Sequence, residues 1–363
     1  MLIKVNSHLR EITPFQLADL NIGSGKPIIS LAQNESAIGP SPKAIEAGQQ
    51  ALLEGHHYPD VNWKKLCEAI ADVHNLESDK VLCGCGSMEL ICAISSAYLG
   101  PGDNAVSTEF GYLLFRMSTR LQRADVNMVR EVDLTVDVDS IVSAVNERTK
   151  VVFIANPGNP TGTCISSEEV IRLRDSLPEN VLLVLDEAYG EFVDIGRKPL
   201  FHLVERNNTV VIRTFSKAYA LAGLRVGWGV FPDAIASEVR KVVNPGTVTG
   251  PAIAMATAAI RDQQHMHTVL DCTFSERRRF TSAIRALGLV VYDSHTNFVL
   301  IQFPSDIAAA SADEALHRES VVMRAMTGTP LGNCLRATIA EPAHMELAGK
   351  VLADWASEYD LNN

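Results

Sequence analysis

The stretch Val181-Leu182-Leu183-Val184-Leu185-Asp186-Glu187-Ala188-Tyr189 runs from a continuous apolar segment into a group of polar side chains. A short apolar run of this kind is typical of a strand that is buried on both faces of a parallel sheet. Further strands are expected at residues 80–83, 104–107, 151–155, 210–214 and 227–231, with helices such as 88–98 and 166–177 between them. This alternation predicts an α/β fold with a mostly parallel central sheet in a large domain.

The second half of the chain has a different pattern. Near Asn244-Pro245-Gly246 the alternation gives way to a helical periodicity over residues 252–287. Short strands at 290–292, 298–301 and 335–339, with helices at 311–318 and 342–359, then predict a smaller α+β domain. A chain of 363 residues is also longer than a single core usually serves. We therefore expect an N-terminal arm and part of the small domain at 1–43, a large domain at 44–250 and a small C-terminal domain at 251–363.

The composition is that of a folded globular protein, with 47% apolar and 21% charged residues. No apolar run approaches the ~20 residues of a membrane span, and the N-terminus does not resemble a signal peptide, so we expect a cytoplasmic protein without a membrane partner. The net charge of −11 repels phosphates and argues against a nucleic-acid partner. Seven scattered cysteines predict no disulfide framework. Cys83 and Cys85 lack the second knuckle of a zinc site, so no metal is expected.

Three short motifs bring together side chains with complementary chemistry. Lys217 follows a candidate buried strand, where partial desolvation favours the neutral, nucleophilic amine. Asp186 ends its strand at the edge where α/β proteins bind ligands, and it can hold a pyridine nitrogen protonated. Tyr189 and Asn159, the latter in a rigid turn at 156–162, can contact a phenolic oxygen of the same ring. This set suits pyridoxal phosphate. Taken singly, Lys217 is compatible with a surface lysine and Asp186 with a helix cap.

An anion-binding group is expected beside these residues. The turn at Gly86, Ser87 and Met88 lies between a strand and a helix, so that backbone amides and a hydroxyl point at a phosphate. Hydroxyls and a guanidinium close to Lys217 in the sequence can contact the same anion: Thr214, Ser216 and Arg225. Tyr112 offers an aromatic face for the ring, although an aromatic residue at such a place is more often part of the core.

Together these motifs resemble those of class I/II pyridoxal-phosphate aminotransferases of the type I fold, and most closely the histidinol-phosphate aminotransferase group. The resemblance extends from Asn34-Glu35 through Tyr58-Pro59-Asp60 to Leu335-Arg336. It implies that Tyr58 reaches the phosphate of a neighbouring subunit, which predicts a homodimer with shared active sites. It also implies the following roles: Lys217 forms the Schiff base with the cofactor, Asp186 pairs with the pyridine nitrogen, Asn159 and Tyr189 contact the ring oxygen, and Arg225 binds the phosphate.

The resemblance further implies a substrate site. Arg336 matches the arginine that grips the substrate α-carboxylate through two parallel hydrogen bonds, although a surface ion pair is the alternative. Asn34 and Asn297 are similar to secondary contacts for the carboxylate or for positioning, and Arg324 is expected beside the pocket. The expected reaction moves an amino group between an amino donor and a 2-oxo acid, with Lys217 carrying the proton. The expected donor is a histidinol-phosphate-like amine or an aromatic or other L-amino acid.

Three departures from the family pattern bear on the substrate. Met88 stands where the group usually has an acid, and aromatic hydroxyls near the substrate are replaced at Phe15 and Gly246. Those losses argue against a phosphorylated substrate. A decarboxylase, a cyclising lyase or an oxidase on the same scaffold is an alternative, because pocket geometry decides which bond breaks. A non-enzymatic cofactor-binding regulator is another, but the basic DNA-binding region expected ahead of such a domain is not found in this sequence.

Overall fold

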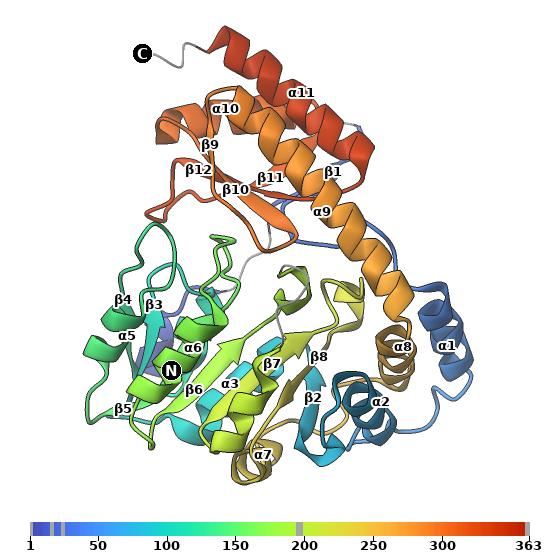
Figure 1. Cartoon of the computed structure of the whole chain (residues 1–363), viewed down its shortest axis with the longest axis vertical. Coiled ribbons are helices and arrows are strands. Elements are labelled where there is room, and N and C mark those ends of the chain that lie inside the picture. The colour runs from blue at the N-terminus through green and yellow to red at the C-terminus, as the bar shows by residue number, and fades with distance from the viewer. Residues whose placement is uncertain (1–2, 15–17, 23–25, 194–198, 360–363) are drawn as a thin grey trace.

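The computed structural model describes residues 3–14, 18–22, 26–193 and 199–359. The protein has two parts, a larger layer and a smaller layer, each of which consists of one β-sheet with its helices. The larger layer is built around a seven-stranded sheet and the smaller one around a five-stranded sheet (Figure 1). The strands of the larger sheet are β2 Val81–Cys85, β3 Asn104–Thr108, β4 Asp125–Val129, β5 Thr149–Ala155, β6 Leu182–Asp186, β7 Thr209–Thr214 and β8 Val226–Val230. Phe15 lies outside the described residues, so its expected place beside the substrate stays a prediction.

The larger sheet has the strand order β2-β8-β7-β6-β5-β3-β4. Strand β8 is antiparallel to both of its neighbours, and the other adjacent pairs are parallel. The expected mostly parallel sheet is therefore confirmed, and each of the six expected strands occurs in it. Strand β4 was not expected. It lies at the edge of the sheet with only Val129 buried, so its sequence lacks the apolar run that marks the central strands.

Helices accompany the strands of the larger layer. They are α1 Pro42–Leu52, α2 Lys64–His74, α3 Ser87–Tyr98, α4 Leu113–Leu121, α5 Val138–Ala144, α6 Ser167–Ser176, α7 Asp233–Arg240 and α8 Gly250–Arg261, with the 3-10 helices η1 Ser7–Glu11, η2 Ser78–Lys80, η3 Gly190–Phe192, η4 Leu200–Arg206 and η5 Ala222–Leu224. Ser166 caps α6, because its hydroxyl accepts the N–H of Glu169 at 3.2 Å. The side chains of Ser41, Asp137 and Thr249 cap α1, α5 and α8 in the same way.

The smaller layer combines a short N-terminal strand with the C-terminal part of the chain. Its strands are β1 Ile29–Leu31, β9 Val290–Val291, β10 Phe298–Gln302, β11 Val321–Ala325 and β12 Cys334–Thr338, in the order β1-β11-β12-β10-β9. Strand β1 pairs in parallel with β11, and the other pairs are antiparallel. Helices α9 Gln263–Ala286 and α10 Asp306–Arg318 contact strands of this sheet, and α11 Pro342–Glu358 packs against both helices. An N-terminal segment thus completes a sheet made by the C-terminal third.

Each layer has its own apolar core, and α9 takes part in both. Phe274 belongs to the core of the larger layer, whereas Phe280 and Ile284 belong to the core of the smaller one. The helical stretch expected at 252–287 is confirmed, but it is divided into two helices, α8 and α9, with Asp262 between them. The Asp262 carboxylate accepts hydrogen bonds from Ser41 and Lys43, which ties the break to the start of α1. The division of the chain at residues 43 and 250 stays a prediction.

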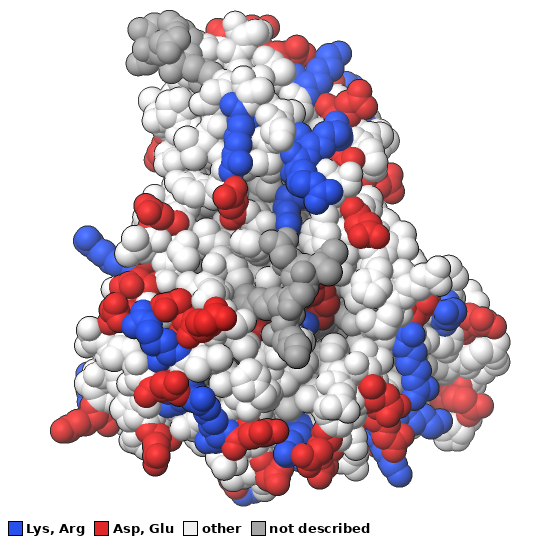
Figure 2. Space-filling view, viewed as in Figure 1, with Lys and Arg blue, Asp and Glu red and all other residues white. Residues whose placement is uncertain are grey.

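The surface carries both signs of charge. Figure 2 shows acidic and basic side chains interspersed over the larger layer on the face drawn. Among the helices that the structure describes, none is long and apolar enough to cross a bilayer.

Candidate active site

A cavity of about 880 Å³ lies between the two layers. Ala155, Asp186 and Thr214, the last residues of β5, β6 and β7, line it from the larger layer. Arg324 and Arg336 line it from strands β11 and β12 of the smaller layer. The cavity therefore occupies the carboxyl edge of the parallel strands, which is the usual ligand site of open α/β sheets.

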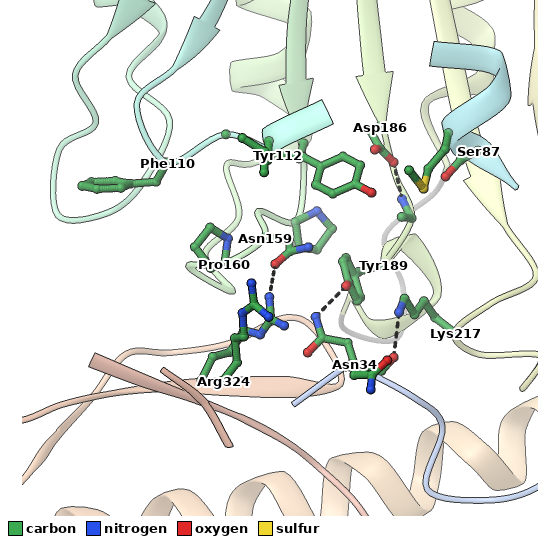
Figure 3. Close-up of a pocket in the computed structure, with 18 of the residues that line it drawn as sticks. Asn34, Ser87, Phe110, Tyr112, Asn159, Pro160, Asp186, Tyr189, Lys217 and Arg324 are labelled. Atoms are coloured by element: carbon green, nitrogen blue, oxygen red, sulfur yellow. Dashed lines mark hydrogen bonds between the residues drawn. The ribbon is translucent and has the colours of Figure 1, made fainter. Parts of the chain in front are cut away.

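Lys217 projects into this cavity just after β7 (Figure 3). Its Nζ donates a hydrogen bond of 2.7 Å to the backbone carbonyl of Asn34. Burial, and then the positive charge of Arg336, lower the pKa of the Lys217 amine to about 7, while Glu35 acts in the opposite direction. A substantial fraction of this amine is therefore neutral near pH 7, and a neutral amine is a nucleophile.

Asp186 occupies the end of the central strand β6 and is only 3% exposed. One carboxylate oxygen accepts the backbone N–H of Ala188 at 2.9 Å. Burial raises the pKa of Asp186 to about 7; the N–H of Ala188 acts in the opposite direction, and the charge of the neighbouring Glu187 adds to the rise. Because a buried carboxylate without a cationic partner is unfavourable, a positively charged ligand atom placed here stabilises the ionised form.

Tyr189 and Asn159 line the same cavity, and Figure 3 draws both side chains. The Tyr189 hydroxyl accepts a hydrogen bond of 2.9 Å from the side-chain amide of Asn34. The Asn159 side-chain oxygen accepts one of 2.6 Å from Arg336. With its hydroxyl oxygen accepting from Asn34, Tyr189 keeps its proton available for donation. Burial also raises the pKa of Tyr189 to about 12, so the phenol stays protonated at neutral pH.

A group of hydroxyls and one guanidinium lies beside Lys217. The hydroxyl of Thr214 donates to Ser216 at 3.0 Å, and Arg225 donates to Ser216 at 3.4 Å. Ser87, at the first turn of α3, lines the cavity with them. Gly86 does not line the cavity, but its φ of +74° and the 2.5 Å between a built Cβ and the Arg225 guanidinium show why glycine is needed there. Hydroxyls, a guanidinium and a helix N-terminus are the chemistry that binds a phosphate.

Two neighbouring positions complete this end of the cavity. Met88 lines it, and its sulfur lies 3.9 Å from a nitrogen of Arg225 where the family usually has an acid. The nearby acid Glu89 is turned away, because its carboxylate accepts the backbone N–H of Cys85 and the hydroxyl of Thr247. Tyr112 lines the cavity as expected, at the N-terminus of α4.

Two arginines of the smaller layer face the cavity together. Arg324 of β11 and Arg336 of β12 are directly paired across antiparallel strands, so both side chains point to the same face of the sheet. Arg336 donates to the carbonyl of Ala32 at 2.9 Å, and its guanidinium lies 5.2 Å from the ring centre of Phe298. Its buried Nε has no hydrogen-bond partner among the described residues. Burial lowers the pKa of Arg336 to about 10, and Arg324 contributes to the lowering. Because two positive charges lie directly opposite each other across these strands, the site suits an anion.

Besides Gly86, two expected site residues do not line this cavity. Asn297 is buried behind it, where its amide donates to the carbonyls of Asn34 (3.1 Å) and Glu35 (3.0 Å), so it supports the lining instead of forming it. Tyr58 is 99% exposed and lies outside the lining of its own chain's cavity. Gly246 is also outside the lining, in a turn where a built Cβ would lie 3.9 Å from Pro59.

Some lining residues were not expected from the sequence. Glu109, Phe110 and Arg116 come from the segment after β3, and Met326 and Leu331 come from the segment after β11. The position of Glu109 directly after a parallel strand was the available signal, because strand ends share one edge of the sheet. The residues after β11 carried no such signal, since that strand itself was not expected.

The described residues contain one further group with possible metal ligands. Glu54, His56 and His57 place ligand atoms within 4.8 Å of one another, but all three are exposed and none lines the cavity. All seven cysteines are free.

The cavity as a whole fits a pyridine aldehyde with a phosphate. It combines an amine of lowered pKa, a buried carboxylate that requires a cationic partner, a protonated phenol and a phosphate-type group, which come from the ends of β6 and β7 and from the start of α3. The arginine pair lies across the cavity from the larger layer and is left for a second anion.

Comparisons with known proteins give consistent similarities. The sequence model of the aminotransferase class I and II family matches residues 26–350. The chain is 38% identical over 341 residues to the histidinol-phosphate aminotransferase of Jannaschia sp. (strain CCS1), covering 94% of each protein. It is 41% identical over 318 residues to that of Dinoroseobacter shibae, covering 86% of this chain and 87% of the relative. The solved histidinol-phosphate aminotransferase of Sinorhizobium meliloti, in complex with pyridoxal-5'-phosphate, has a TM-score of 0.92 at 27% identity and 99% coverage of both chains.

Proposed function

Because the chain belongs to the aminotransferase class I and II family and is a pyridoxal-phosphate-dependent aminotransferase acting on small amino and keto compounds, we propose that its amino donor is an anionic amine. The donor carries a carboxylate or a phosphate ester close to the amine, and the acceptor is a 2-oxo acid. One observation carries this proposal: Arg324 and Arg336 face the cavity from paired positions of β11 and β12.

The arginine pair supports an anionic substrate on physical grounds. Like charges directly opposite on a sheet are destabilising, and desolvation adds to the cost at Arg336. A carboxylate or phosphate oxygen between them would offset both terms, and the unpartnered Nε of Arg336 supplies a free donor. Arg336 also bonds Asn159, which would couple the position of the anion to the residue expected at the cofactor ring.

Lys217 is proposed as the attachment point of the cofactor and as the proton carrier of the reaction. Pyridoxal phosphate, when bound, supplies a cationic ring that accepts the electron pair left at the substrate carbon. Asp186 would keep the ring nitrogen protonated, since its buried carboxylate is stabilised by such a partner. Tyr189 and Asn159 would hold the ring oxygen from the two sides. Once released, the Lys217 amine, with a pKa near neutrality, can take a proton from one carbon and return it to another.

The cofactor phosphate is assigned to the group at the start of α3. Its members would be Ser87 and Met88 with the backbone made possible by Gly86, together with Thr214, Ser216 and Arg225. Tyr112 would cover the ring from the N-terminus of α4.

We also propose a homodimer in which Tyr58 completes the site of the partner. The almost full exposure of Tyr58 outside its own cavity supports this role. The turn at Gly246 lies beside Pro59, so the glycine there bears on the same contact and not on the cavity of its own chain. A cytoplasmic location is proposed as well, because all seven cysteines are free, as is usual in a reducing compartment.

Histidinol phosphate is the leading donor candidate, because the relatives reported above carry that name. An L-amino acid is the second candidate, favoured by the absence of aromatic hydroxyls at Phe15 and Gly246. Both place an anion near the amine, so both use the arginine pair.

A donor scan tests the proposal. The purified, cofactor-loaded protein is mixed with histidinol phosphate, histidinol, L-histidine or L-phenylalanine, and the half-reaction is followed by cofactor absorbance. Histidinol differs from histidinol phosphate only in lacking the anion, so we expect no reaction with it. Arg336→Gln should lose most of the preference for anionic donors, whereas Arg172→Lys, at an exposed site on α6, should behave as wild type. Equal rates with histidinol and histidinol phosphate, or an unchanged preference in Arg336→Gln, would contradict the proposal.

A further inference from the structure

A buried ion triad lies directly beside the proposed cofactor contacts. Arg213, the penultimate residue of β7, donates to Glu187 through Nε (3.1 Å) and Nη2 (2.6 Å) and to Glu191 through Nη1 (3.1 Å). The three side chains are between 4% and 5% exposed. Glu187 follows Asp186 at the end of β6, and Glu191 lies in η3. None of the three lines the cavity.

The guanidinium of Arg213 is enclosed on its other sides. A Cβ built at Gly190 would lie 2.6 Å from the guanidinium carbon, so the chain passes directly over it. The ring centre of Phe201 lies 5.3 Å from the guanidinium carbon. That ring in turn packs on Trp228, against which His74 is stacked at 5.1 Å. Arg213 therefore has little freedom to reorient.

Stability alone is a poor explanation for such a group. Burying three charged side chains costs desolvation energy, and apolar residues of similar volume often serve as well. Burial lowers the pKa of Arg213, but Glu187 and Glu191 outweigh it, so the guanidinium stays charged. Two carboxylates on one guanidinium do, however, fix a geometry that apolar contacts do not, because the fork of donors is planar and rigid.

The geometry that is fixed belongs to the turn carrying two site residues. Asp186 directly precedes Glu187, and Tyr189 lies between Glu187 and Glu191. The two ion pairs to Arg213 therefore hold the turn at both of its ends. Within it, the N–H of Gly190 donates to the carbonyl of Glu187 at 2.8 Å. The N–H of Ala188 donates to the Asp186 carboxylate at 2.9 Å, so the turn also orients that carboxylate.

We infer that Arg213, Glu187 and Glu191 form a positioning triad, which holds the turn so that Asp186 meets the ring nitrogen and Tyr189 meets the ring oxygen of the cofactor. The inference rests on the proposed roles of Asp186 and Tyr189. The three residues touch neither cofactor nor substrate and act through these two side chains.

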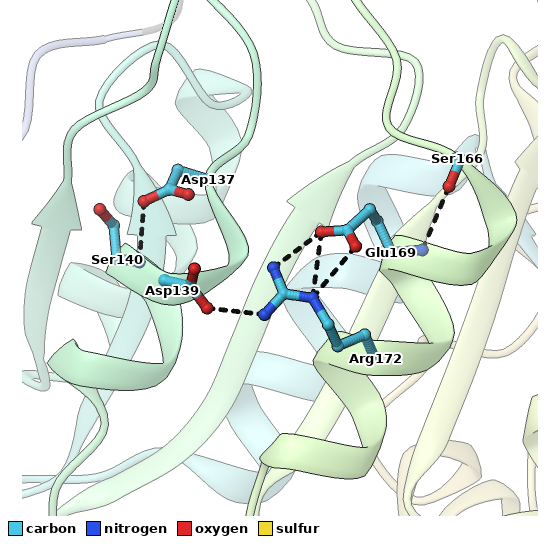
Figure 4. Close-up of polar contacts among 6 residues, drawn as sticks. All are labelled: Asp137, Asp139, Ser140, Ser166, Glu169 and Arg172. Atoms are coloured by element: carbon cyan, nitrogen blue, oxygen red, sulfur yellow. Dashed lines mark hydrogen bonds and ion pairs between the residues drawn. The ribbon is translucent and has the colours of Figure 1, made fainter.

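The test compares two arginines with the same arrangement and different surroundings. Arg172 also binds two carboxylates, those of Asp139 and Glu169, but its side chain is 42% exposed and lies on α6, on the surface of the larger layer (Figure 4). Arg213→Lys and Arg172→Lys each keep the positive charge but lose the planar guanidinium, which donates to two carboxylates at once. Both variants are prepared without cofactor, and circular dichroism reports their folding. Titration with pyridoxal phosphate then gives its affinity, and the absorbance of the bound cofactor is followed against pH.

We expect Arg213→Lys to keep the wild-type circular dichroism and to bind the cofactor on the order of tenfold more weakly. We also expect it to shift the midpoint of the pH-dependent absorbance change, while Arg172→Lys matches the wild type in both. If Arg213→Lys does not fold, Glu191→Gln replaces it, since that variant keeps volume and an acceptor oxygen and should shift the midpoint less. Wild-type affinity and midpoint in a folded triad variant would overturn the inference, whatever its melting temperature.

Asp186→Asn separates this inference from the proposal on which it rests. If Asp186→Asn alters the absorbance midpoint and the triad variants do not, only the triad inference fails. If Asp186→Asn itself leaves the midpoint unchanged, the proposed role of Asp186 fails and the inference fails with it.

Discussion

The lowered pKa of Lys217 predicts how fast the cofactor-free protein captures pyridoxal phosphate at each pH. The ordinary lysine pKa is 10.5, and in this cavity it is about 7. Only the neutral amine attacks the cofactor aldehyde. At pH 8 the neutral fraction is roughly 0.9 for a pKa of 7 and roughly 0.003 for the ordinary value, a difference of about 300-fold. The capture rate should therefore rise about tenfold per pH unit below pH 7 and level off above about pH 8.

Replacing Arg336 tests the cause of the lowered pKa. Burial is the largest contribution at Lys217 and the charge of Arg336 is the next, so removing that charge should reverse only part of the shift. We expect Arg336→Gln to move the midpoint of the capture rate upward by up to about one pH unit. Arg336→Lys keeps the positive charge and should leave the midpoint close to the wild-type value.

Rapid mixing of cofactor-free protein with pyridoxal phosphate at a series of pH values measures this rate. Asp186 also titrates near pH 7, so the series is repeated with Asp186→Asn, in which that titration is absent. A wild-type midpoint near 10 would refute the reasoning about burial. Equal shifts in Arg336→Gln and Arg336→Lys would refute the assignment of the second contribution to charge.

Three further predictions follow from the same contacts. In thermal melts of the cofactor-free protein, stability should fall from pH 3.8 to about 7, because the unfolded chain releases a proton that the folded Asp186 keeps. Stability should then rise from about pH 7 to 10.5, because the unfolded chain binds a proton that the folded Lys217 lacks. A flat profile would contradict both pKa values. Gly86→Ala should weaken cofactor binding in an equilibrium titration, since the new Cβ meets Arg225 and the φ of +74° costs about 1–3 kcal/mol; unchanged affinity would count against the anion site. Phe280→Ala should cost about 3–5 kcal/mol in urea unfolding, because Phe280 is 2% exposed in the core of the smaller layer; a loss below about 1 kcal/mol would mean that this core collapses around the gap.

Much of the larger layer could be predicted from the sequence because its central strands are buried on both faces. Strand β6 is an uninterrupted apolar run, and Asp186 marks the point where it reaches the cavity. The same reasoning placed Lys217 and Thr214 at the cavity, since they lie at the end of β7. Where strand ends share an edge, local sequence is enough to bring distant residues together.

The parts that could not be predicted depend on contacts between distant segments. The break at Asp262 is stabilised by Ser41, more than two hundred residues away, and the periodicity on either side gives no sign of it. Asn297 was expected at the substrate, but its amide is used by the backbone near Asn34. Arg213 carried no local signal, because its partners follow a different strand of the sheet.

Helix α9 constrains how the cavity can change its width. It has 24 residues, so it is a rod of roughly 36 Å that is embedded in both cores. Any separation of the layers must bend this helix or rotate it about its N-terminal end at Asp262, where the helical conformation is interrupted. A turn of about 5° there would displace the Ala286 end by roughly 3 Å, about the length of one hydrogen bond. A small rotation at the N-terminal end of α9 would thus give a larger displacement of the smaller layer, which carries the two arginines of the cavity.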